Sequence, residues 1–186
     1  TFSNFYRRRA IRLLPALNVM LLLVLLFGFF FYTNKSFDVL GKEITFSALG
    51  LANILFAQGI DYFASEDAYK PLIHLWSLGV EEQFYVIWPL IVLLSYKFSK
   101  NIGFSIFICS ILFIFSLFSS EVNLQNDAVK TYFYPQYRIF ELLIGAGLGL
   151  ILFKTEKLFL VHYRAPLAVL GLFFILYSGI FFSKNT

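Results

Sequence analysis

Two adjacent carboxylates and a histidine stand at the beginning of a strongly apolar segment. The stretch HLWSLGVEEQFY, residues 74–85, runs directly into VIWPLIVLLSY. A low-dielectric site favours the neutral form of a carboxylate, so such a group can take up a proton or orient a histidine that does so. Glu81 and Glu82 are therefore candidate acid–base residues, and His74 is their candidate partner.

Helical geometry would separate these two carboxylates. At about 100° per residue, one stripe holds His74, Leu78, Glu81, Tyr85 and Trp88. Glu82 lies about 100° round from Glu81, so we expect Glu81 to follow the stripe and Glu82 to point to its side. His74 and Glu81 are about 10 Å apart along a straight helix, so contact between them requires the preceding loop to fold back.

Ionisable residues within an apolar segment usually line a bundle interior or a water-filled cavity, which favours a functional role for Glu81 before Glu82. The competing interpretation is an interfacial cap. Acidic residues stabilise a helix N-terminus, and tryptophan and tyrosine favour the headgroup region. For His74, a loop position without a role is an equal alternative.

Four arginines lie within six positions in FYRRRAIRLLPAL, residues 5–17. Guanidinium groups bind phosphate in a fork geometry that lysine cannot supply, so the cluster is a candidate anion site. The alternative is topological, because basic residues flank membrane spans on the cytoplasmic side.

A third group lies in YFYPQYRIFELLIGAGLGL, residues 132–150. Arg138 and Glu141 are spaced i, i+3, which predicts an ion pair at the start of a helix. Gly145 and Gly149 form a small-xxx-small face, which predicts close helix packing. The tyrosines of this stretch are typical interface anchors.

The elements that position these residues are hydrophobic helices. The 186-residue chain is 59% hydrophobic and 20% aromatic, which exceeds an ordinary soluble domain and requires several spans of about 20 apolar residues. The segments are 13–32, 44–60, 76–96, 102–119, 139–153 and 165–182. Without period-2 alternation, they predict an all-α, polytopic transmembrane bundle of five to six hydrophobic helices, forming one domain over residues 1–186.

The polar segment 44–60 is expected to be interfacial or re-entrant and not to span. If it does not cross, nine of the fifteen basic residues fall in three cytoplasmic clusters, and the loops 33–43, 61–73 and 120–137 lie outside. The net charge of +4 in short flanking clusters suits a lipid bilayer and predicts no nucleic-acid partner. One cysteine, Cys109, and two histidines predict no disulfide and no metal site.

Taken in order, three motifs resemble the acyltransferase 3 family of integral-membrane O-acyltransferases, which includes O-antigen and peptidoglycan O-acetylating proteins. These motifs are FYRRRAIRLLPAL, PLIHLWSLGVEEQFYVIWPL and YPQYRIFELLIG. The similarity extends from Phe5 to about Gly149, and the second motif is the most specific. Phe140 departs from the family pattern, because a tryptophan is expected there.

The resemblance implies transfer of an acyl group, most simply acetyl from acetyl-CoA, to a hydroxyl of a cell-surface carbohydrate acceptor. It implies a multi-pass protein of the bacterial inner membrane, with acyl-CoA and the carbohydrate as its partners. It implies acyl-CoA handling by Arg9 and Arg12. It also implies a part in acyl transfer for Glu81 or Glu82 and for tyrosines matching Tyr62 and Tyr134. The further candidate substrate-binding residues are Trp76, Arg138 and Glu141.

Two further expectations concern the extent of the protein. In the family that the motifs resemble, the first span carries a histidine ten residues after a basic residue, and further spans follow the matched region. This sequence shows neither feature. The resemblance therefore predicts that the sequence is a piece of a longer protein and that another segment or a companion polypeptide completes the site. The rival interpretations are a transporter or flippase-like protein, whose charged residues bind substrate or protons without covalent chemistry, and an inactive truncated product.

Overall fold

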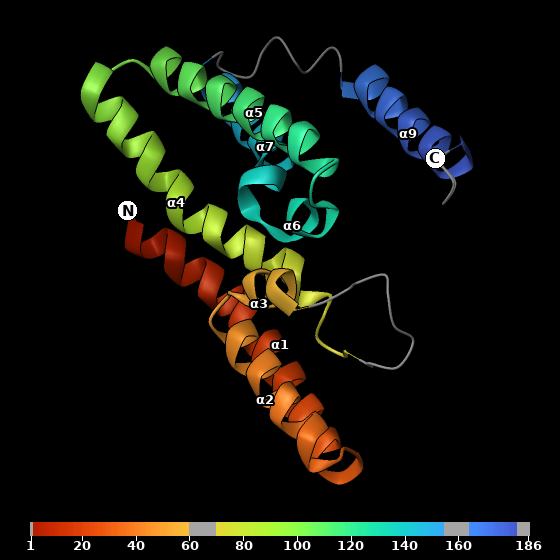
Figure 1. Ribbon diagram of the computed structural model, residues 1–186. Coiled ribbons are helices and arrows are strands. Elements are labelled where there is room, and N and C mark those ends of the chain that lie inside the picture. The colour runs from red at the N-terminus through yellow and green to blue at the C-terminus, as the bar shows by residue number, and fades with distance from the viewer. Residues whose placement is uncertain (1, 60–69, 155–163, 182–186) are drawn as a thin grey trace.

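The computed structural model describes residues 2–59, 70–154 and 164–181, and this part of the protein consists of helices joined by short connections (Figure 1). The helices are α1 (Phe2–Phe31), α2 (Asn34–Ala48), α3 (Ala52–Gly59), α4 (Leu75–Ser99), α5 (Ile102–Leu124), α6 (Ala128–Phe133), α7 (Pro135–Lys154) and α9 (Arg164–Phe181). No strand occurs in these ranges, so the predicted all-α fold class is confirmed.

Four stretches of the described chain are helical, long and apolar enough to cross a membrane: Phe2–Phe31, Leu75–Ser99, Ile102–Leu124 and Ala128–Lys154. The apolar helix Ala165–Gly179, within α9, is shorter. Large apolar side chains are exposed along all of these helices, for example Phe29 and Phe30 on α1 and Phe118 on α5. Such surfaces are stable when lipid covers them, as the membrane prediction requires.

Helices α4, α5 and α7 form one bundle, in which α5 runs antiparallel to the other two. Near the α4–α5 turn, the Ser95 and Ser105 hydroxyls are 2.6 Å apart. At the other end of α5, Ser116 donates a hydrogen bond of 2.7 Å to the Gln136 carbonyl of α7. A small apolar core of Phe84, Cys109 and Leu143 lies between these polar contacts. Packing in this bundle therefore fixes which side of α4 faces its neighbours. Helix α4 carries Glu81, Glu82 and Gln83.

Helices α1 and α2 form an antiparallel hairpin that lies side by side in the lower part of Figure 1. Gly28 makes the close approach possible, because a Cβ atom there would collide with the Leu40 side chain. The prediction that residues 33–43 form a loop is wrong. These residues are helical because Phe37 and Leu40, together with Ile44 further along α2, present an apolar face to the core that α1 shares.

Segment 44–60 is divided at Gly50, whose φ of +69° suits a glycine and ends the helical path of α2. The second half forms the short helix α3, and the structure agrees with the prediction that 44–60 is not a single span.

Two other boundaries differ from expectation. Helix α1 begins at Phe2 and includes the arginine cluster, and the predicted loop 120–137 contains the end of α5 and all of α6. Within the predicted loop 61–73, residues 61–69 lie outside the described residues.

Helix α4 runs antiparallel to the first half of α1. The Tyr6 hydroxyl of α1 donates to the Val86 carbonyl of α4, and Arg9 lies opposite Glu82. Glu82 is seven residues into α4, about 10 Å from its beginning, whereas Lys97 lies about 22 Å further along. Arg9 thus lies beside α4 at a point well inside that apolar helix, as well as near the beginning of α1.

Candidate active site

The α2–α3 turn is held against α4 by a polar joint around Gly79. A Cβ atom on Gly79 would lie 2.7 Å from Asn53 Oδ1 and 3.2 Å from the Gly50 carbonyl oxygen, so only a glycine allows this approach. Gln83 donates to the Gly50 carbonyl at 3.0 Å and to Asn53 Oδ1 at 2.8 Å. Asn53, which is fully buried, donates in turn to the Phe133 carbonyl. This joint fixes one wall of a cavity next to Glu82.

Arg9 is the centre of a charged cluster between α1 and α4. Its Nε and Nη2 donate to Glu82 Oε1 at 3.1 and 2.9 Å, and Nη2 lies 3.9 Å from Glu81 Oε2. The guanidinium carbon lies 3.4 Å from the centre of the Tyr85 ring, which is a close cation–π contact. Arg9 is therefore held by three side chains of α4, and its charge is balanced by a nearby pair of carboxylates.

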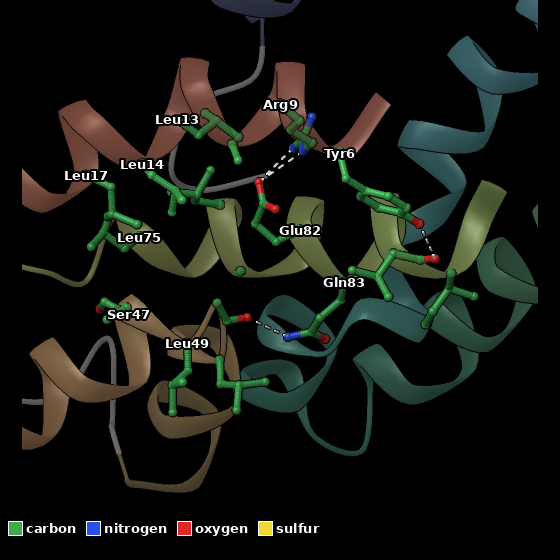
Figure 2. A pocket seen from close by; sticks show the side chains of 18 residues that line it. Tyr6, Arg9, Leu13, Leu14, Leu17, Ser47, Leu49, Leu75, Glu82 and Gln83 are labelled. Carbon is green, nitrogen blue, oxygen red and sulfur yellow. Dashed lines mark hydrogen bonds and ion pairs between the residues drawn. The ribbon is translucent and has the colours of Figure 1, made fainter. Parts of the chain in front are cut away.

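The Arg9–Glu82 pair lies on the wall of a cavity of about 490 Å³ between α1, the α2–α3 turn and α4. Figure 2 shows Arg9 and Glu82 linked by dashed lines between Tyr6 on one side and Leu14 on the other, with Ser47 and Leu75 further from them. Most of the remaining wall is apolar, and it includes Leu13, Leu14, Leu17, Leu49 and Leu78. The volume falls within the range of about 300–1,000 Å³ that is typical of small-molecule sites.

A second cluster lies at the beginning of α4 and α7. Arg138 forms the predicted ion pair with Glu141 at 3.0 Å. Its guanidinium carbon also lies 5.5 Å from the Trp76 ring centre and 5.1 Å from that of Tyr132. The structure thus brings the candidate residues Trp76, Arg138 and Glu141 together, apart from the Arg9 cavity.

Glu141 also lines a wide groove of about 860 Å³, to which Phe2, Trp88, Gly145 and Gly149 contribute. The prediction that Gly145 and Gly149 pack closely against another helix is wrong for the described residues. A Cβ atom on either glycine would meet nothing within 4 Å, whereas one on Gly147 would contact Cys109 at 3.4 Å.

The remaining predicted residues are scattered. His74 precedes α4 with an exposed side chain and forms no hydrogen bond or ion pair with Glu81 among the described residues, so the loop does not fold back in the way that contact between them requires. Arg12 is exposed, and Tyr134 lies at the α6–α7 turn, outside the walls of both the cavity and the groove. Tyr62 lies outside the described residues.

The structure distinguishes the two carboxylates by their position relative to the cavity. Glu82 faces Arg9 and lines the cavity, whereas Glu81 is not among the residues that line it and has 46% of its side chain exposed. Sequence reasoning also missed Tyr6 and Gln83, and it missed Glu43 and Ser47 on the buried face of α2. The i, i+4 spacing of that last pair was a usable signal, but the polar composition of residues 33–43 suggested a loop.

The chain matches, over residues 1–186, a family described as an acyltransferase domain. It is 32% identical over 152 residues to the peptidoglycan O-acetyltransferase OatA of Listeria monocytogenes, which covers 80% of this chain and 24% of that protein. It is also 32% identical over 151 residues to the O-acetyltransferase OatA of Staphylococcus aureus, with the same coverage. An uncharacterized protein of Haemophilus influenzae is 28% identical over 190 residues, which covers all of this chain and 78% of that protein.

The chain thus spans about a quarter of the length of the two named O-acetyltransferases. No solved structure matches it. Its relatives are bacterial, and several of its helices are candidate spans, so it is a multi-pass bacterial membrane protein. With the family match over the whole chain and the three motifs in their expected order, the chain belongs to the acyltransferase 3 family of membrane acyltransferases.

Proposed function

We propose that this chain carries the donor site of a membrane O-acyltransferase, which moves an acetyl group from acetyl-CoA to a hydroxyl of a cell-surface carbohydrate. The observation that carries the proposal is the Arg9–Glu82 pair on the wall of a mostly apolar cavity. The O-acetyltransferase relatives support the carbohydrate acceptor, and the name of the Listeria protein specifies peptidoglycan. Membership of an acyltransferase family favours covalent chemistry over the transport alternative.

An acyl-CoA molecule combines negatively charged phosphates with a long thioester arm, and α1 offers a surface suited to each. Arg7, Arg8 and Arg12 are exposed around Arg9, where guanidinium groups can bind phosphates bidentately. The leucine-lined cavity beyond them can take the uncharged arm. Arg9 itself is engaged by Glu82, Glu81 and Tyr85, so its role is to position the carboxylates and balance their charge.

The carboxylate of Glu82 is the group that we place beside the reacting thioester. Its Oε1 accepts both hydrogen bonds from Arg9, while Oε2 accepts none among the described residues. In the transfer step, the acceptor hydroxyl oxygen bonds to the acyl carbon and the carbon–sulfur bond breaks. The thiolate leaves with the electron pair, and a carboxylate oxygen accepts the hydroxyl proton. A transient acyl-tyrosine, with Tyr134 as the described candidate, would divide this transfer into two steps.

Acetyl transfer in membrane vesicles tests this proposal. Vesicles containing the full-length protein would receive radiolabelled acetyl-CoA and soluble peptidoglycan fragments, and labelled product would be counted. We expect Glu82→Gln to lower the rate by about two orders of magnitude, the scale of losing a general base, with Glu81→Gln lowering it less. The matched control is Glu121→Gln at the exposed end of α5, which should leave the rate unchanged.

Two results would contradict the proposal. A near-normal rate in the Glu82→Gln protein would remove Glu82 from the chemistry. A loss of acetyl transfer in the Glu81→Gln protein alone would show that Glu81, and not Glu82, takes part in the reaction, as the helical stripe predicts.

A further inference from the structure

Glu43 and Ser47 are two buried polar side chains on α2, and each has a side-chain oxygen without a hydrogen-bond partner among the described residues. Each is about 4% exposed, and neither Glu43 Oε2 nor Ser47 Oγ makes a hydrogen bond. Buried polar atoms in native proteins are nearly always hydrogen-bonded, so two unpaired groups close together require an explanation. Spaced i, i+4, they lie one turn apart on the same helix face.

The surroundings of this pair are apolar. Leu40 and Ile44 of α2 belong to the core that the hairpin shares with α3 and the α4 region. α2 is not among the candidate membrane spans. Burial raises the pKa of Glu43 to about 6, and the positive charge of Lys70 opposes this rise only in part. Glu43 therefore buries a carboxyl oxygen without a hydrogen bond in a place where an apolar side chain would pack at lower cost.

The pair adjoins the cavity that contains Arg9 and Glu82. Ser47 lies on the cavity wall, next to the Gly50 turn. Glu43 lies one turn nearer the beginning of α2, which is the end of the hairpin opposite the arginine cluster. The polar groups of this region thus form two sets: the charged cluster of α1 and α4, and the Glu43 carboxyl and Ser47 hydroxyl of α2, of which only Ser47 lines the cavity.

We propose that Glu43 and Ser47 form a subsite that binds a hydroxyl of the carbohydrate acceptor other than the one that attacks, an assignment that rests on the proposed function. A carboxylate oxygen accepts the hydrogen bond of a hydroxyl, and a serine hydroxyl can donate to the hydroxyl oxygen or accept from it. An alcohol therefore satisfies both side chains at once, whereas an acyl chain would leave both unpaired. This hydroxyl would lie on the α2 side of the cavity, next to Ser47.

Steady-state kinetics distinguish a binding subsite from a merely structural pair. In vesicles containing the full-length protein, we expect Glu43→Gln and Ser47→Ala each to raise the KM for peptidoglycan fragments about tenfold, the scale of one lost hydrogen bond to a charged group. The KM for acetyl-CoA should not change. The matched controls are Asp38→Asn, exposed on the same helix, and Ser110→Ala, exposed on α5. An unchanged KM for the acceptor, or equal changes for donor and acceptor, would overturn the subsite.

Carbodiimide labelling supplies a test that needs neither turnover nor a variant that might misfold in the membrane. A hydrophobic carbodiimide modifies protonated, buried carboxyl groups, and mass spectrometry locates the product. We expect modification of Glu43 in the wild-type protein at about pH 6, and protection when peptidoglycan fragments are added but not when acetyl-CoA is added. Equal modification with and without the fragments would overturn the proposal and leave the pair hydrated by water only.

These measurements separate the two proposals. If wild-type vesicles transfer acetyl groups while the Glu43 and Ser47 variants keep a normal KM for the acceptor, only the subsite fails. If the vesicles transfer none, the proposed function fails, and the protection of Glu43 still decides whether a carbohydrate binds there.

Discussion

Arg9 is the residue on which the site depends. It forms two hydrogen bonds to Glu82, lies within 3.9 Å of Glu81 and stacks on Tyr85. A planar guanidinium can do all of this at once, whereas an ammonium group cannot. The side chain is only 20% exposed, so little water is available to replace a lost contact. Arg9 therefore couples α1 to the carboxylates of α4.

This coupling predicts that Arg9→Lys impairs the protein although the charge is kept. We expect kcat/KM for acetyl-CoA to fall by about tenfold or more, because truncating a partly buried, hydrogen-bonded ion pair costs about 1.5–3 kcal/mol. The control is Arg8→Lys, since Arg8 is exposed and its Nε donates only to the Asn4 carbonyl. If both changes lowered kcat/KM for acetyl-CoA equally, the arginine cluster would serve only to set the membrane topology.

At the scale of elements, the cavity exists because the α2–α3 turn is packed tightly against α4. Gly79 removes the side chain that would keep Asn53 and the Gly50 carbonyl away, and Gln83 bonds to both of them. The left-handed conformation at Gly50 turns the chain between α2 and α3, and α3 packs against α4. Glycine at these two positions therefore decides the shape of the site.

We expect Gly79→Ala to disrupt this joint. The added Cβ would lie 2.7 Å from Asn53 Oδ1, so the turn must move, and overpacking of this kind costs about 1–3 kcal/mol. The change should lower the thermal unfolding temperature in detergent, measured by tryptophan fluorescence. Gly145→Ala is the control, because a Cβ there meets nothing within 4 Å. Equal unfolding temperatures for Gly79→Ala and the wild type would contradict the account of the joint.

The sequence predicts the long helices better than the connections between them. Unbroken apolar runs locate α1, α4, α5 and α7, because a spanning helix must be apolar along its length. Helix α2 was missed, because Lys35, Lys42 and Gly41 suggest a loop while its apolar face pairs with α1 only in the folded chain. For the same reason, helical geometry gives the angle between Glu81 and Glu82 but not which one faces α1.

For the whole molecule, the relative directions of the helices bear on membrane topology. The beginning of α1 and the end of α4 point the same way, and Lys154 at the end of α7 lies beside the α4–α5 turn, near Gly103. The beginning of α1 therefore points toward the end of the bundle that carries Lys97, Lys100 and Lys154. This arrangement agrees with the clustering on which the predicted sidedness depends.

Sidedness can be measured by labelling introduced cysteines with a membrane-impermeant reagent, in a protein with Cys109→Ser. We expect Phe98→Cys to react only after the cells are opened, and Asp127→Cys to react in intact cells. Reaction of residue 98 from outside would reverse the orientation and place the arginine cluster away from cytoplasmic acyl-CoA.

The central claim is that the cavity between α1, the α2–α3 turn and α4 binds the acyl donor, and a photoreactive acyl-CoA analogue tests this most directly. After illumination in vesicles and digestion, mass spectrometry would locate the attached label. The account predicts label on cavity residues such as Leu13, Leu49 or Leu78, and its loss when excess acetyl-CoA is present. Label confined to the groove formed by Phe2, Trp88 and Gly149, with the cavity residues unmodified, would contradict it.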